Sequence, residues 1–499
     1  MSRHFWWLTD RNSVRAQVAR AAPIVLSATI LSEILNFARS VILARLLTPA
    51  DFGLVGMALL WVSLSLVLTE LGVGQALIHM QSDDPAAWST AWWISAARGV
   101  LLCGLLVLIA PWAEAFFAAP GLAVYLRVLA ITVLLGNLQS MGMVQWQRDM
   151  AFLQLKSVVL IAEVAALLAA TYVAWQTRSP WALVVASVVR SLVVFVVPYV
   201  AHSFRPSRRF QPQIAGRILR YSTRMLGSGV LAYGILEGDA ALVGKVLGAT
   251  DLGLYRLATR LSNLPSTMVS QVLMQVMLPV YAQMQESRER QLSAYLKVLQ
   301  AAAFLAFAMA VLLAMTAREI VTLVYGSQWL AMVPAFIVMC GFSAARTLGG
   351  LASPLFQAVG KPQIVVRLLF LQLAVMAVGI YPLTISLGIL GTALAVTCAA
   401  VSNQFAVFHA LSRYFQVSVL SLVKQIFPFL VATALAVVAC LVVGSLVGHS
   451  GSWLALVVRG ITTGLVYVAV TAAMLRRQLL ALLEFAIPRC RFVASNGSR

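Results

Sequence analysis

The sequence has few charged residues for its length, and acidic residues are especially scarce. Of its 499 residues only 10% are charged and only 16 are Asp or Glu. A soluble globular protein carries about 25% charged residues, most of them on its surface, so this composition excludes that class. The apolar fraction of 61% instead places the chain in a lipid bilayer.

Cysteine and histidine are also rare, with five of each. The cysteines stand singly at Cys103, Cys340, Cys398, Cys440 and Cys490. None has the paired spacing of a metal or redox motif, so we interpret them as small packing residues. The histidines are equally isolated, and the sequence predicts no metal site and no cofactor.

Long polar segments are missing, which leaves no room for a soluble domain. Apolar runs of about 20 residues, the length of a membrane-spanning helix, follow one another from Ala21 to Met474. The chain is therefore predicted to be an all-α polytopic membrane protein of about fourteen transmembrane helices. Their predicted ranges are 21–47, 51–78, 88–111, 121–146, 153–175, 180–202, 223–247, 251–284, 294–316, 328–350, 363–386, 388–411, 424–447 and 453–475.

The net charge of +20 has a topological explanation. Basic residues gather in alternate loops and in the tail, as the positive-inside rule requires of cytoplasmic segments. This pattern predicts a bacterial inner-membrane protein with both ends in the cytoplasm, and nucleic-acid binding is not needed to explain the charge. The first helix lacks a cleavable site, so residues 1–20 are interpreted either as a retained cytoplasmic interfacial segment or as a disordered basic tail.

An internal repeat divides the chain. The stretch from Leu46 to Leu54 is matched, 200 residues later, by the stretch from Val246 to Leu254, with Arg45 or Lys245 just before. Each stretch is predicted to form a tight outer-face hairpin in which glycine allows a neighbouring helix to approach closely. The repeat predicts two parallel six-helix lobes. The predicted divisions are an N-lobe at 21–202, a basic cytoplasmic linker at 203–222, a C-lobe at 223–411, two further helices within 424–475 and a basic cytoplasmic tail at 476–499.

Polar residues on the first predicted helix share one face. Glu33, Asn36 and Arg39 fall, together with Ser32 and Ser40, within an arc of about 120° on a helix that turns 100° per residue. Charge in the hydrocarbon region is costly, so this face is expected to line the space between the lobes. The alternative is that Glu33 and Arg39 satisfy each other or neighbouring helices.

The eighth predicted helix carries Arg256 and Arg260 one turn apart on a polar face that continues to Gln271. Two guanidinium groups in this arrangement form a fork for an anion, because each can bind oxyanions bidentately and stays charged. Arg256 lies close to the helix end, where an arginine that snorkels to the interface is the alternative.

Further charged residues make the interior net basic. Arg98 and Arg127 are predicted to line the same space, which suits an anionic substrate, whereas Arg190 is interpreted as a residue of a packed helix. Glu237 and Asp239 bring acids into the seventh predicted helix. Together with Glu33 they either bind a proton or sodium ion for coupling or, through an Asp239 to Arg39 pair between the lobes, hold one state closed.

The sequence from Leu47 to Leu54, followed by that from Leu71 to Ile78, resembles the Wzx-like polysaccharide flippases of the WzxC type. These belong to the multidrug, oligosaccharidyl-lipid and polysaccharide exporter (MOP) superfamily. The resemblance implies a V-shaped, two-lobed transporter, and not an enzyme, that moves an undecaprenyl-pyrophosphate-linked oligosaccharide by alternating access for exopolysaccharide, capsule or O-antigen synthesis. It also implies partnership with a polymerase and export machinery. Arg39, Arg256 and Arg260 match the cavity arginines expected on the first and eighth helices, whereas the second helix lacks a basic residue after Asp51.

Three alternatives stay open at this point. A flippase for the lipid-linked peptidoglycan precursor would differ only in substrate. A multidrug exporter of the same superfamily would favour a cavity rich in acids or aromatics, which the excess of arginine disfavours. A membrane-embedded glycosyltransferase or polymerase would favour a large acidic loop, and the longest predicted loops are short.

Overall fold

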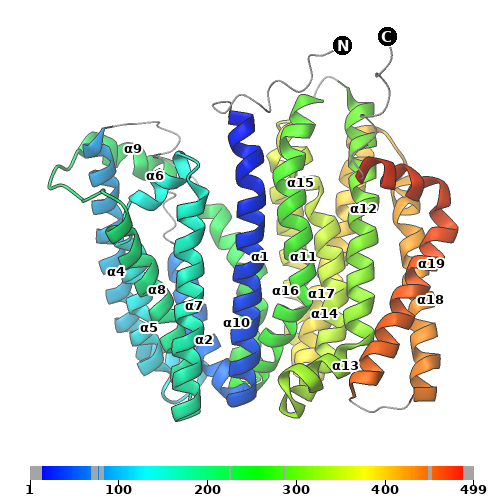
Figure 1. Ribbon diagram of the computed structural model, residues 1–499, viewed down its shortest axis with the longest axis horizontal. Helices are drawn as coiled ribbons and strands as arrows, with labels where there is room; N and C mark the ends of the chain where they lie inside the picture. The colour runs from blue at the N-terminus through cyan, green and yellow to red at the C-terminus, as the bar shows by residue number, and fades with distance from the viewer. Residues whose placement is uncertain are drawn as a thin grey trace, which may run out of the picture. The chain divides into compact units, whose positions relative to one another are not determined.

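The computed structural model describes residues 14–68, 77, 84–223, 226–284, 287–447 and 452–486. Within these ranges the chain is helical and contains no strand (Figure 1). It forms two compact units, Met1–Gly253 and Leu254–Arg499. The all-α prediction is therefore confirmed for the part of the chain that is described.

The first unit holds the helices up to the start of α11. These are α1 (Val14–Leu46), α2 (Pro49–Leu68), α4 (Pro85–Phe117), α5 (Leu122–Asn137), α6 (Gly142–Arg148), α7 (Phe152–Thr177), α8 (Trp181–Ala201), α9 (Pro212–Thr223), α10 (Leu226–Val246) and the first turn of α11 (Ala249–Gln283).

The second unit continues from α11. It contains α12 (Arg288–Met315), α13 (Ala317–Ile320), η2 (Val321–Tyr325), η3 (Ser327–Met332), α14 (Val333–Gly350), α15 (Ala352–Ala358), α16 (Pro362–Leu387), α17 (Ile389–Phe415), α18 (Val419–Val447) and α19 (Trp453–Ala486). One of its core clusters packs aromatic side chains from α12, α15, α17 and α18, among them Tyr295, Phe356, Phe408 and Phe429.

Eleven helical segments among the described residues are long and apolar enough to cross a membrane, and a bent pair would make twelve. The bent pair is α5 and α6, whose axes meet at 53°. The sequence predicted one continuous helix over 121–146, which is wrong, because the chain leaves the helix between Leu138 and Met141. The predicted ranges 223–247 and 251–284 correspond to α10 and α11, which are not among the eleven, so the total of fourteen spans stays a prediction.

Both ends of the bundle differ from the predicted ranges. α1 already begins at Val14 and α19 continues to Ala486, so parts of the predicted N-terminal segment and C-terminal tail are helical. Residues 1–13 and 487–499 lie outside the described part of the chain. The predicted linker 203–222 contains most of α9 and is fastened to α4, where Ser207 N donates to Ser89 Oγ over 3.0 Å and Gln211 N donates to Thr90 Oγ1 over 3.0 Å.

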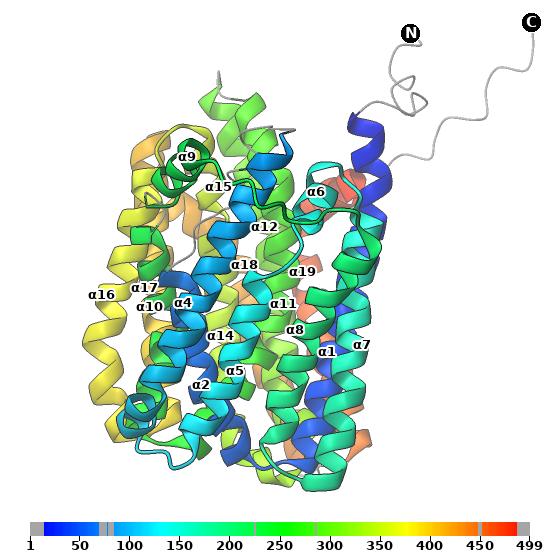
Figure 2. The same ribbon diagram turned by 90° about the vertical axis from the view of Figure 1, so that its left-hand side faces the viewer.

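Small residues bring α1, α7 and α8 close together (Figure 2). Four alanines of α7 and α8 are buried against Leu43 of α1 and against Leu47, the residue that follows α1. They are Ala170, Ala174, Ala182 and Ala186. In a bilayer the helices gain little from the hydrophobic effect between them, so close backbone approach and van der Waals contact hold such an interface. This packing fixes the three helices from which the site described below is built.

The two copies of the repeat motif touch at equivalent positions. A Cβ atom on Gly53 of α2 would lie 1.6 Å from Ala249 O, and one on Gly253 of α11 would lie 1.9 Å from Pro49 O. Only glycine permits such backbone contact, and the close approach predicted for Gly53 is therefore present. The first turn of α2 is also capped, because Asp51 Oδ2 accepts from Thr48 N over 2.8 Å and from Thr48 Oγ1 over 2.7 Å.

Candidate functional site

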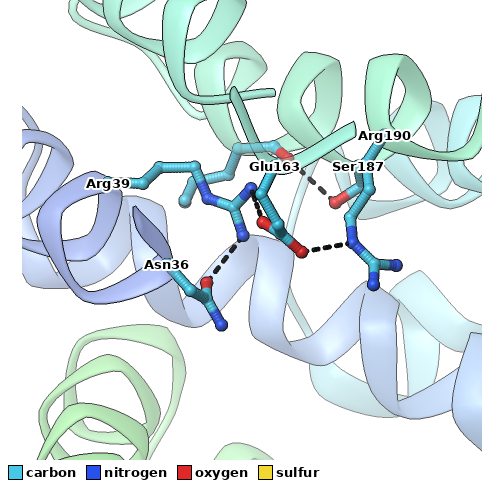
Figure 3. Close-up of polar contacts among 6 residues, drawn as sticks. Asn36, Arg39, Glu163, Ser187 and Arg190 are labelled. Atoms are coloured by element: carbon cyan, nitrogen blue, oxygen red, sulfur yellow. Dashed lines mark hydrogen bonds and ion pairs between the residues drawn. The ribbon is translucent and has the colours of Figure 1, made fainter. Parts of the chain in front are cut away.

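A cluster of charged side chains joins α1, α7 and α8 inside the first unit (Figure 3). Arg39 Nη1 of α1 donates to Glu163 Oε2 of α7 over 3.0 Å, and Arg190 Nε of α8 donates to Glu163 Oε1 over 2.7 Å. Asn36 Oδ1 accepts from Arg39 Nη2 over 2.8 Å, one turn earlier on α1. We call Asn36, Arg39, Glu163 and Arg190 the α1–α7–α8 cluster.

The burial of these side chains is unequal. The Glu163 side chain is 7% exposed and the Arg39 side chain 17%, whereas the Arg190 side chain is 46% exposed. Two guanidinium groups share one carboxylate, so the cluster carries a net charge of +1. Both oxygens of Glu163 are occupied by cationic donors, and this arrangement favours an anion over a cation as a ligand.

The sequence did not identify Glu163 as a site residue, and Arg190 was interpreted as a residue of a packed helix. The available signal was the position of each as a lone charge in a long apolar run, since such residues in a membrane normally face a partner or a cavity. The partners expected for Arg39 were Glu33, a neighbouring helix or Asp239. The structure pairs Arg39 with Glu163 of the neighbouring helix α7. Glu33 is exposed, and Asp239 is buried and accepts a hydrogen bond from Ala240 N over 2.7 Å.

The described hydrogen bonds and ion pairs of this cluster do not include the remaining predicted residues of the first unit. Arg98 Nε of α4 donates to Asn137 Oδ1 of α5 over 2.8 Å, and Asn137 is buried. Arg127 of α5 is exposed, and Glu237 of α10 is half-buried. Only Asn36 and Arg39, among the predicted binding residues of this unit, are therefore brought together by a described hydrogen bond.

Arg256 and Arg260 lie in the second unit on α11. Arg260 is exposed and Arg256 is half-buried, with Asn263 also half-buried one turn further along the helix. Two residues four positions apart on a helix are about 6 Å apart along the axis. Binding of one oxyanion by both guanidinium groups stays a prediction. The side chains of Ser270 and Gln271, which extend the predicted polar face, lie outside the described residues.

A second buried ion pair was also missed. Arg459 Nη1 of α19 donates to Glu319 Oε1 of α13 over 2.9 Å, and the two side chains are 12% and 1% exposed. A Cβ atom on Gly444 of α18 would lie 3.2 Å from the Arg459 guanidinium, so the glycine leaves room for it. This pair holds the C-terminal helix hairpin on the rest of the second unit.

No group of three or more His, Cys, Asp or Glu side chains that could hold a metal ion occurs among the described residues. The charged clusters that are described combine an acid with arginine. Their chemistry is therefore that of ion pairs and oxyanion binding.

Comparison with known proteins gives a family match over more than half of the chain. The family model described as polysaccharide biosynthesis protein matches residues 42–334. The succinoglycan biosynthesis transport protein ExoT of Rhizobium meliloti is 26% identical over 331 residues, which are 66% of this chain and 66% of ExoT. The lipopolysaccharide biosynthesis protein WzxC of Escherichia coli is 20% identical over 70% of this chain and 72% of WzxC.

Solved structures with the same fold include two membrane transporters. The lipid II flippase MurJ in an inward closed conformation aligns with a TM-score of 0.73 at 13% identity, covering 91% of this chain and 99% of MurJ. An inward-facing multidrug resistance MATE family transporter of the MOP superfamily aligns with a TM-score of 0.60 at 17% identity, covering 81% of this chain and 99% of that chain. At these identities the likeness shows the fold alone.

These matches confirm the Wzx-like resemblance that the Leu47 to Leu54 motif suggested. The helices long enough to span a bilayer and the shared transporter fold also confirm a multi-pass membrane protein. The chain belongs to the family of polysaccharide biosynthesis proteins whose model it matches from residue 42 to residue 334.

Proposed function

We propose that this protein is a flippase that moves a lipid-linked oligosaccharide, joined through a pyrophosphate to its polyprenyl tail, from the cytoplasmic to the outer leaflet of the bacterial inner membrane. Its family membership supports this function, as does its similarity to ExoT, which is named as a transport protein of succinoglycan biosynthesis. The same similarity favours a transporter over a membrane-embedded glycosyltransferase or polymerase.

The observation that carries the proposal is the placement of arginines within the helices of a multi-pass membrane protein. Arg39 and Arg190 meet at one carboxylate in the first unit, and Arg256 and Arg260 lie one turn apart on α11. Each charge at the centre of a membrane helix costs about 2.5–3.5 kcal/mol on insertion scales, so an excess of positive over negative groups requires a compensating gain. An anionic substrate supplies that gain, because guanidinium groups bind phosphate oxygens bidentately.

Transport follows by alternating access in this proposal. The arginines hold the pyrophosphate and the first sugar, while the polyprenyl tail stays in the lipid. Glu33, Glu237 and Asp239 are the candidates for coupling to a proton or sodium gradient, since a carboxylate in a membrane can exchange its cation as the protein changes state. Both termini lie in the cytoplasm, and the released substrate passes to a polymerase and the export machinery.

A lipid-linked peptidoglycan precursor carries the same pyrophosphate and would bind the same arginines. A multidrug exporter would instead take organic cations, which the positive charge of these sites disfavours. The peptidoglycan precursor therefore differs from the proposed substrate in its sugar. The substrate of a multidrug exporter differs from it in its charge.

The test is transfer of a labelled, pyrophosphate-linked oligosaccharide lipid across reconstituted vesicles under an imposed proton gradient, sodium gradient or potential. The wild type is compared with Arg260→Ala, with the Arg256→Ala and Arg260→Ala double variant, and with Arg367→Ala. Arg367 is an exposed arginine near the start of α16, and its replacement controls for loss of surface charge.

We expect the wild type and Arg367→Ala to accelerate transfer and the double variant to lose it while still inserting in the membrane. Transfer of a peptidoglycan precursor with a rate equal to or above that of the oligosaccharide lipid would move the assignment to that substrate. No acceleration by the wild type under any gradient would refute the flippase, and a cationic dye would then be tested next.

A further inference from the structure

The segment that joins α8 to α9 passes over α4 and is fastened to it at two points (Figure 2). Ser207 N and Ser207 Oγ each donate to Ser89 Oγ over 3.0 Å, and Gln211 N donates to Thr90 Oγ1 over 3.0 Å. We call residues 207–211 the strap. Because both of its ends are hydrogen-bonded to one helix, the three residues between them are presented at a defined place on the first unit.

The three residues between these anchors are Arg208, Arg209 and Phe210, and all of them are exposed. The Phe210 side chain is 51% exposed. Neither guanidinium group makes a hydrogen bond or an ion pair with another described residue. Cationic side chains beside an exposed aromatic one are typical of segments that rest on a membrane surface, where the ring enters the lipid and the charges meet the headgroups.

The anchors place the strap at the depth of the lipid headgroups. The apolar helix Pro85–Phe117 has 33 residues and is therefore about 50 Å long, whereas the hydrocarbon core of a bilayer is about 30 Å thick. Ser89 and Thr90 lie within its first two turns, which extend beyond that core. Trp93, 41% exposed, donates from Nε1 to Ser207 O over 2.9 Å, and tryptophan is enriched at the membrane interface.

The charge around the strap favours an anionic surface. Asp84 is the acid in contact with the strap, and its Oδ2 accepts from Gln211 Nε2 over 3.1 Å. The strap itself contains two arginines and no acid, and α9 continues with an exposed Arg217 after the buried Ile214. Basic side chains at this depth attract the phosphate groups of anionic lipids, because the attraction acts within about a Debye length of the membrane surface.

We propose that the strap is a binding site for anionic phospholipids, in which Arg208 and Arg209 bind headgroup phosphates and Phe210 enters the lipid beside them. This inference does not rest on the proposed function. It needs only that the chain is a multi-pass membrane protein. The competing explanation is that these arginines act only as a topological signal, in which case the strap has no preference between neutral and anionic lipids.

The experiment measures hydrogen–deuterium exchange of the backbone amides of residues 208–210 in the full-length protein. The protein is placed in nanodiscs of phosphatidylcholine and in nanodiscs that also contain phosphatidylglycerol, and each variant is compared only with itself. The test variant is the Arg208→Gln and Arg209→Gln double variant. The matched control is the Arg178→Gln and Arg318→Gln double variant, because these two exposed arginines lie at the membrane surface opposite to the strap in the predicted topology. A further arm adds inorganic phosphate to the neutral nanodisc.

We expect exchange in the wild type and in the control to be about fivefold slower or more in the anionic nanodisc, since each basic residue near an anionic surface strengthens attachment by about that factor. The Arg208→Gln and Arg209→Gln double variant should lose this difference. Phe210→Ser should reduce it in part. In the wild type, about 1 M sodium chloride should abolish it, because salt screens exposed charges, and this arm needs no variant.

Equal exchange of the wild type in the two nanodiscs would overturn the inference. The same conclusion follows if the slower exchange persists in the Arg208→Gln and Arg209→Gln variant or at high salt, because the lipid would then act elsewhere or without charge. If inorganic phosphate in the neutral nanodisc slows exchange as much as phosphatidylglycerol does, the strap binds soluble anions and the lipid site is refuted. Unchanged protection in Phe210→Ser would refute entry of Phe210 into the lipid.

Discussion

Gly53 and Gly253 stand at equivalent positions of the internal repeat, and each faces the backbone carbonyl at the start of the other's helix. Gly53 meets residue 249 and Gly253 meets residue 49, so the contact is reciprocal with the same spacing of 200 residues that separates the repeats. Two side-chain hydrogens, and no larger groups, fit between the starts of α2 and α11. The repeat is therefore preserved in packing as well as in sequence.

Alanine at either glycine should destabilise the protein. The new Cβ atom would lie 1.6 Å from Ala249 O in Gly53→Ala and 1.9 Å from Pro49 O in Gly253→Ala, so the helices must separate. Overpacking of this kind costs about 1–3 kcal/mol, and each variant should unfold at a lower temperature in detergent. Gly104→Ala is the control, because nothing lies within 4 Å of its Cβ position in α4 and alanine there should not lower the unfolding temperature. Equal thermal stability of all three variants would contradict the close contact.

Loss of one partner of the Arg459 to Glu319 pair should be more harmful than loss of both. Arg459→Met leaves the Glu319 side chain, 1% exposed, without its cation. An uncompensated buried charge costs about 3–5 kcal/mol, whereas replacing both partners by neutral groups is often close to neutral. A double-mutant cycle with Glu319→Gln, followed by thermal unfolding, measures the coupling. If the effects of the two single variants simply add, the pair makes no net contribution to stability.

His202, just past the end of α8, should make stability depend on pH. Burial lowers the pKa of its imidazole, with opposing effects from Asp149, which raises the pKa, and Arg205, which lowers it. Its Nδ1 accepts from Phe204 N over 2.9 Å, and its ring packs edge-on against Trp146, with 5.3 Å between centroids. Because the folded-state pKa is depressed, the unfolded chain binds the proton more readily, and the stability from neutral His202 is present above about pH 6.5 and declines as the pH falls.

The measurement is the unfolding temperature of the wild type and of His202→Asn between pH 7.5 and pH 5. The wild type should lose stability on acidification by a larger amount than the variant, whose side chain does not titrate in this range. Parallel pH profiles would show that His202 is not responsible.

Placing a carboxylate at Asn36 should weaken binding of an anionic substrate. Asn36→Asp has nearly the same shape and keeps the acceptor for Arg39 Nη2, but it changes the charge of the α1–α7–α8 cluster from +1 to neutral. We expect the Kd for a pyrophosphate-linked lipid to rise by about tenfold, which corresponds to about 1.4 kcal/mol. Titration of the probe in nanodiscs provides the measurement. Asn36→Ala, which removes the acceptor without adding charge, should have the smaller effect, and the reverse order would argue against an electrostatic role.

The sequence determined the class of the protein and the approximate positions of its helices. Hydropathy is a local property that adds up along about 20 residues, so apolar runs predict spans without knowledge of their neighbours. The repeat around Gly53 and Gly253 and the charge of Arg39, Arg256 and Arg260 were likewise visible in one dimension. The hydropathy of residues 121–146 did not predict the bend between α5 and α6, because hydropathy does not depend on the local geometry of the backbone.

Only the tertiary structure decided which charges meet. Glu163 lies 124 residues from Arg39 and 27 from Arg190 in the chain, and the three come together because small residues let α1, α7 and α8 pack with particular faces in contact. The rotation of one helix against another depends on the whole set of packing contacts. For this reason the sequence singled out Arg39 as a site residue but not the carboxylate that holds it.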